Sequence, residues 1–102
     1  MGGEMTQGYF EEHWLDANGN PAGGVSCGKG FTISWQNGPL GQAGTPGRPA
    51  ANGACIEDVL QAIMGRLTFY QASKFACIEN EKAIAYLEGA ADWLDARTAE
   101  TH

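Results

Sequence analysis

The sequence predicts an α+β protein, in which a small N-terminal antiparallel β-sheet is followed by a C-terminal two-helix hairpin. Chain-breaking residues concentrate in the first half, because 13 of the 15 glycines and all four prolines lie at or before Gly53. The second half is rich in Ala, Leu, Ile and Glu, and its apolar residues recur every three or four positions. We expect a single domain over 1–102, with a β-rich half at 8–40, a Gly/Pro loop at 41–53 and a helical hairpin at 54–98.

Two segments of the first half, 9–15 and 25–35, are predicted to form strands. The residues between them, 16–24, are dense in types that tolerate turn dihedrals. Apolar residues of the second strand alternate with polar ones and therefore share one face of a sheet: Phe31, Ile33 and Trp35.

The second half contains two amphipathic stretches, which predict helices from just after Gly53 to about Gln71 and over roughly 78–98. The first has one apolar stripe: Ile56, Val59, Leu60, Ile63, Met64 and Leu67. The second has two adjacent stripes, one of Ile84, Leu87, Ala91 and Leu94 and one of Ala83, Tyr86, Ala90, Trp93 and Arg97. A short connection makes the helices antiparallel neighbours, and the extra stripe is available to another subunit or a ligand.

The charge balance excludes several partners. Six Lys and Arg stand against 12 Asp and Glu, so the net charge is −6 and the pI is near 4.6. This argues against a DNA or RNA polymer and against an anionic membrane as partner. We expect no signal peptide and no membrane span, and three widely spaced cysteines indicate reduced thiols. A chain of 102 residues has a small core, which favours oligomerisation.

Motifs for catalysis are weak. Residues 23–30 imitate a phosphate-binding loop, but Gly30 stands where that motif needs Ser or Thr, so a glycine-rich hairpin is the better interpretation. His13, His102 and the cysteines lack zinc-ligand spacing, and no serine or cysteine lies in a nucleophile elbow. Acidic residues of the helices fit solvated faces. We therefore expect no enzyme, no metal and no cofactor.

The segment 69–80 crowds three aromatic residues, an amide and a cation around a short turn. Aromatic faces stack on bases, amides read base edges, and cations bind phosphate. Arg97 lies four residues after Trp93 and is expected to reach the same surface. From the residues alone, we favour an interpretation in which Tyr70 and Phe75 plug the end of the hairpin, and a nucleotide site is the alternative.

Several stretches carry a resemblance to a known family. The most specific are Lys74-Phe-Ala-Cys-Ile-Glu-Asn80 and the closing Trp93-Leu-Asp-Ala-Arg-Thr98. With Asn52-Gly-Ala-Cys-Ile-Glu-Asp-Val-Leu60 and the earlier Gly30-Phe-Thr-Ile-Ser-Trp-Gln-Asn-Gly-Pro-Leu40, their order and spacing resemble phage anti-Thoeris signal sponges, which are related to anti-CBASS proteins.

The resemblance implies a homo-oligomer, from dimer to hexamer, in the cytoplasm of the infected bacterium. Its implied ligand is a cyclic ADP-ribose isomer of Thoeris immunity, which is held and not cleaved. The implied binding residues are Tyr70, which stacks the base, Asn80 and Arg97, with Phe75 and Arg48 as further candidates.

Two alternatives stay open. One is a sponge for the cyclic oligonucleotides of the CBASS system, bound at a separate site. The other is a helical-hairpin module that binds a protein and no nucleotide.

Overall fold

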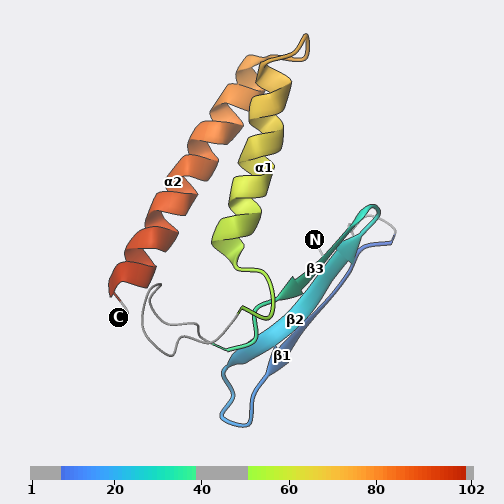
Figure 1. The fold of residues 1–102 in the computed structure, drawn as a ribbon, viewed down its shortest axis with the longest axis vertical. Helices are drawn as coiled ribbons and strands as arrows, with labels where there is room; N and C mark the ends of the chain where they lie inside the picture. The colour runs from blue at the N-terminus through green and yellow to red at the C-terminus, as the bar shows by residue number, and fades with distance from the viewer. Residues whose placement is uncertain (1–7, 39–50, 101–102) are drawn as a thin grey trace. The chain divides into compact units, whose positions relative to one another are not determined.

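The computed structural model describes residues 8–38 and 51–100 and confirms the α+β class (Figure 1). Its elements are β1 (Phe10–Leu15), β2 (Pro21–Gly28), β3 (Phe31–Trp35), α1 (Ile56–Gln71) and α2 (Ile78–Glu100). The chain divides into two compact units, Met1–Cys55 with the strands and Ile56–His102 with the helices.

The three strands form an antiparallel sheet in the order β1-β2-β3. The β1–β2 turn is held by the Asp16 carboxylate, whose Oδ1 accepts hydrogen bonds from the backbone N–H of Asn18 at 2.8 Å and of Asn20 at 3.0 Å. The carboxylate thus provides a hydrogen-bond acceptor for two backbone N–H groups of the turn. The turn is shorter than the predicted 16–24, because β2 already begins at Pro21.

The predicted single strand over 25–35 is wrong, because it is two strands joined by Lys29 and Gly30. Gly30 has a φ of 90°, a conformation that glycine adopts without steric cost, and this reverses the chain between Gly28 and Phe31. The expected alternation in β3 holds in part: Ile33 and Trp35 are half-buried and Ser34 between them is exposed, but Phe31, expected on the same apolar face, is 47% exposed.

A short bridge extends the sheet beyond β3. Ala54 pairs with Trp35 in parallel, and its N–H donates to the Ser34 carbonyl at 2.7 Å while its carbonyl accepts from the Gln36 N–H at 2.9 Å. The hairpin therefore begins later than the predicted 54, because the backbone of Ala54 is engaged in the sheet. The first helical residue is Ile56.

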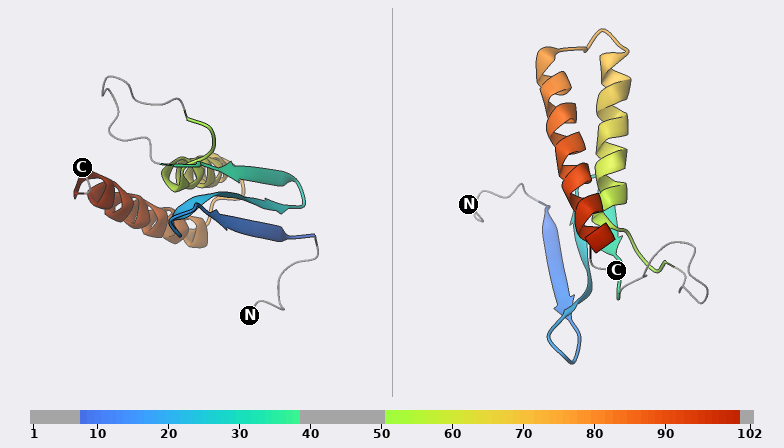
Figure 2. Two further views of the ribbon diagram at one scale, coloured as in Figure 1. Left: turned by 90° about the horizontal axis from the view of Figure 1, so that it is seen from below. Right: turned by 90° about the vertical axis from the view of Figure 1, so that its left-hand side faces the viewer.

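The two helices lie side by side and run antiparallel (Figures 1 and 2). The predicted end at Gln71 and start at Ile78 are confirmed, and α2 continues two residues past the predicted 98. The stripe that packs on α1 contains the buried Ala91, and its other members are half-buried: Ile84, Leu87 and Leu94. Met64 is buried on α1.

The two large aromatic residues of the second stripe of α2 are exposed. Tyr86 is 80% exposed and Trp93 is 79% exposed. Neither helix has a stretch long and apolar enough to cross a membrane, as far as the described residues reach.

Candidate functional site

The turn between the helices is held by the side chain of Gln71, which forms two hydrogen bonds with the backbone of Cys77. The Gln71 Nε2 donates to the Cys77 carbonyl at 3.1 Å, and the Cys77 N–H donates to Gln71 Oε1 at 3.0 Å. A single carboxamide thus joins the last residue of α1 to the residue before α2. This fixes the spacing of the hairpin tip, by which we mean residues 66–80.

A second set of hydrogen bonds positions Phe75. The Ser73 hydroxyl donates to the Tyr70 carbonyl at 2.6 Å and accepts from the Phe75 N–H at 3.0 Å. The Asn80 Nδ2 donates to the Phe75 carbonyl at 3.4 Å. Three of the segment's predicted binding residues, Tyr70, Phe75 and Asn80, are therefore connected through one short turn.

Tyr70 and Phe75 line an open hollow of about 310 Å³. Their ring centroids lie 6.5 Å apart at an interplanar angle of 73°, which is an edge-to-face arrangement. Phe75 is 63% exposed, whereas Tyr70 is half-buried. The volume lies at the lower end of the roughly 300–1,000 Å³ of small-molecule sites, and the two aromatic side chains that line the hollow suit a flat ring such as a base.

Two cations stand at the rim of the hollow. The Arg66 Cζ lies 5.2 Å from the ring centroid of Phe69 and 5.1 Å from that of Tyr70. The Lys74 Nζ lies 5.5 Å from the ring centroid of Phe75. Neither cation forms an ion pair within the described part of the chain. Their charges are therefore available to an anion.

The structure places Arg97 away from the tip. Its Nη2 lies 3.3 Å from Glu57 Oε2, in an ion pair between α2 and the first turn of α1. Tyr70 is 13 residues farther along α1, which is about 20 Å along the helix. The expectation that Arg97 reaches the surface of Tyr70 is therefore wrong within one copy of the chain. Arg48 lies outside the described residues.

The sequence-based site omitted Arg66. The signal for it was present, because Arg66 precedes Phe69 by three residues and Tyr70 by four. On a helix these spacings put side chains on the same face.

Comparison with known proteins identifies the hairpin. Residues 32–99 match the family described as the Acb2/Tad1 hairpin domain. The chain belongs to this family. It is also 42% identical over 74 residues to "Thoeris anti-defense 1" of Bacillus phage SBSphiJ7. The alignment covers 72% of this chain and 48% of that relative, so the chain spans about half the length of the curated relative it matches.

These findings confirm the resemblance to phage anti-Thoeris proteins. The family match covers all but the first residue of β3, all of α1, all but the last residue of α2 and the complete hairpin tip. It leaves out β1 and β2, where a second group of polar side chains lies.

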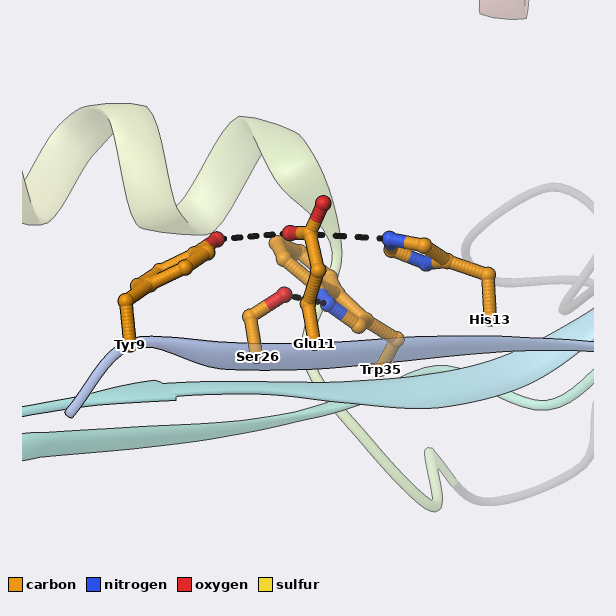
Figure 3. A network of polar contacts seen from close by, with 5 residues as sticks. All are labelled: Tyr9, Glu11, His13, Ser26 and Trp35. Atoms are coloured by element: carbon orange, nitrogen blue, oxygen red, sulfur yellow. Dashed lines mark hydrogen bonds and ion pairs between the residues drawn. The ribbon is translucent and has the colours of Figure 1, made fainter. Parts of the chain in front are cut away.

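This second group is on one face of the sheet (Figure 3). The Tyr9 hydroxyl donates to Glu11 Oε1 at 2.6 Å, and the same oxygen lies 3.6 Å from His13 Nε2. Beside them, the Trp35 Nε1–H donates to the hydroxyl of the buried Ser26 at 2.8 Å. The residues of this group are brought together only by the strand register, which pairs Glu11 with Ser26, so no local sequence pattern predicts them.

The hydrogen bond from Tyr9 lowers the pKa of Glu11, because it stabilises the carboxylate. The same bond raises the pKa of Tyr9, since its hydroxyl must keep its proton to donate. Across residues 8–38 and 51–100, no three or more His, Cys, Asp or Glu side chains are grouped to hold a metal ion.

Proposed function

We propose that this chain binds a cyclic ADP-ribose-type signal of the Thoeris system and sequesters it without cleaving it, in the cytoplasm of the infected host. The observation that carries the proposal is the Tyr70–Phe75 hollow with two cations at its rim. The family match and the anti-Thoeris relative support it independently.

The base of the ligand enters the hollow and stacks on Tyr70 and Phe75. Asn80 lies at the same turn and carries a carboxamide, which offers one donor group and one acceptor to the edge of a base. Rings, amides and cations are binding groups, and they hold a nucleotide without attacking it. Sequestration requires this chemistry alone.

One hollow is too weak to act as a sponge. Stacking contributes about 1–3 kcal/mol per base, whereas nanomolar binding requires about 12 kcal/mol. Small-molecule sites bury roughly 70–90% of their ligand, which an open hollow on one chain cannot do. The proposed functional form is therefore a homo-oligomer, dimer to hexamer, in which a second copy covers the ligand.

A second copy also explains how Arg97, which lies far from the hairpin tip of its own chain, reaches the ligand. If two hairpins pack in opposite directions, the Arg97 end of one copy lies beside the tip of the other. Arg97 then joins Tyr70 and Asn80 around one ligand, although they are about 20 Å apart within a single chain. The second stripe of α2 offers apolar surface for this packing, with Tyr86 and Trp93 exposed.

Titration calorimetry of the full chain with cyclic ADP-ribose isomers tests the proposal. Binding in the nanomolar to low micromolar range is expected, and the ligand should be recovered with unchanged mass after denaturation. Absence of heat up to high micromolar ligand overturns the proposal, and a hydrolysed product overturns sequestration.

Site variants sharpen the same experiment. Tyr70→Ala is expected to weaken binding by at least about tenfold, since it removes a stacking face. Phe10→Ala is the control, because it also removes an exposed aromatic ring but lies on β1, outside the helical hairpin. Arg97→Ala should weaken binding and leave the helical circular dichroism in place. Full affinity in either site variant removes that residue from the site.

Other occupants are separable outcomes. Binding of a cyclic oligonucleotide that does not compete with cyclic ADP-ribose would indicate the separate CBASS-type site. A stoichiometric protein partner captured in the absence of any nucleotide would indicate an interaction module.

A further inference from the structure

We propose that Arg66 is the residue that binds the phosphate of the ligand at the hairpin tip, with Lys74, beside the Phe75 ring, as a second cation. This inference rests on the proposed function and names the group that recognises the ligand's charge. It concerns a residue that neither the sequence analysis nor the comparisons assign.

Arg66 lies next to the ring on which the base is proposed to stack. The Tyr70 ring lines the hollow, and the Arg66 guanidinium lies 5.1 Å from the centroid of that ring. A base in the hollow contacts Tyr70, and we expect the charged phosphates attached to it to lie outside, because the hollow is lined by the aromatic side chains of Tyr70 and Phe75. The rim next to Tyr70 is where this charged part emerges, and Arg66 is the cation there.

The positive charge of Arg66 has no carboxylate partner among the described residues. The described part of the hairpin contains four cations: Arg66, Lys74, Lys82 and Arg97. Arg97 is paired with Glu57 in the same copy, so binding a phosphate there requires breaking or sharing that ion pair. Arg66 contacts aromatic rings and no described carboxylate. Its charge is available to an anion without the loss of another partner.

The guanidinium plane of Arg66 is restricted by the neighbouring rings. The guanidinium is planar and presents its donors in a fixed fork that matches two oxygens of a phosphate. Two rings, Phe69 and Tyr70, lie within 5.2 Å and 5.1 Å of the Arg66 Cζ and restrict where that plane can lie. An arginine held in this way loses less conformational freedom on binding than a free surface side chain.

The net charge of the chain makes local cations necessary. At −6, the protein as a whole repels an anionic nucleotide. The first turn of α2 adds Glu79 and Glu81 close to the tip. An anion therefore binds here only if cations at short range outweigh this field, and Arg66 and Lys74 flank the hollow on its two rings.

The test compares Arg66→Gln with Lys82→Gln in the full chain. Both remove one positive charge from the hairpin, but Lys82 has no contact with the rings of the hollow. For cyclic ADP-ribose we expect Arg66→Gln to weaken binding roughly 10- to 100-fold, as for loss of a charge-assisted hydrogen bond. Lys82→Gln should change it by less than about threefold.

Two further readouts separate phosphate binding from a merely structural role. The affinity of wild type should fall with salt, and the slope should be shallower in Arg66→Gln than in Lys82→Gln. Adenosine, which has the base but no phosphate, should bind wild type and Arg66→Gln equally. Arg66→Lys should recover part of the affinity, because it keeps the charge and loses the fork.

The outcomes are distinct. If wild type binds no cyclic ADP-ribose, the proposed function and this inference both fail. If wild type binds and Arg66→Gln behaves as Lys82→Gln does, the inference fails and the proposed function stands. If Arg66→Gln weakens adenosine as much as cyclic ADP-ribose, Arg66 positions Tyr70 and does not bind phosphate, which also overturns the inference.

Discussion

Removing the Gln71 side chain should destabilise the helical hairpin. Gln71→Ala deletes two hydrogen bonds to the Cys77 backbone, of 3.1 Å and 3.0 Å. Each intramolecular hydrogen bond contributes about 0.5–1.5 kcal/mol, and Cys77 is exposed, so water replaces the lost partner in part. Alanine also favours the helix slightly over glutamine. The expected net loss is about 1–2 kcal/mol in the free energy of unfolding.

The matched control is Gln61→Ala. It makes the same change at an exposed position of α1, where the side chain forms no hydrogen bond among the described residues. Urea unfolding followed by circular dichroism at 222 nm gives both values, and amide exchange at Cys77 reports the local effect. Equal stability of the two variants, within about 0.3 kcal/mol, would refute the view that Gln71 fixes the turn.

The sheet provides two further predictions. Ser26→Ala should lower the free energy of unfolding by about 1–3 kcal/mol, because it leaves the Trp35 Nε1–H without its partner at a part-buried position. Ser34→Ala, at an exposed position, is the control and should change the stability little. Tryptophan fluorescence during urea unfolding measures both variants. Tyr9→Phe should reduce the stability advantage of neutral over acidic pH. Because the pKa of Glu11 is lowered in the folded state, its contribution exists above the ordinary value of 4.5 and is lost as the pH falls through the folded value. Urea midpoints of wild type and Tyr9→Phe at pH 7 and pH 3 should therefore differ more at pH 7, and an equal difference at both would contradict the assignment.

The helices were the most predictable part of the fold. Long stripes with three- and four-residue spacing leave few alternatives in the second half, which contains only two of the 15 glycines and no proline. The predicted helix boundaries at Gln71 and Ile78 therefore agree with the structure. The late start at Ile56 could not be predicted in this way. It depends on Ala54 pairing with Trp35, a contact between residues far apart in sequence.

The strands were less predictable for a physical reason. Lys29-Gly30 falls inside a run that alternates on both sides, so the composition was compatible both with the glycine-rich hairpin expected over 23–30 and with the single strand expected over 25–35. Only the φ of 90° at Gly30 turns that run into a hairpin. The polar group around Glu11 depends on the strand register that follows from this hairpin. A sequence interpretation that misses the reversal at Gly30 therefore cannot predict that these residues meet.

The candidate site shows the same division between local and distant contacts. Tyr70, Phe75 and Asn80 share one turn, so their proximity follows from the sequence alone. Arg97 is 17 residues after Asn80 on one continuous helix, and the rise of an α-helix therefore separates them by about 25 Å. A ligand small enough for the hollow cannot span that length within one chain. If all three residues hold one ligand, two hairpins must run in opposite directions, and a twofold axis between them creates two equal sites, each with the tip of one copy and Arg97 of the other.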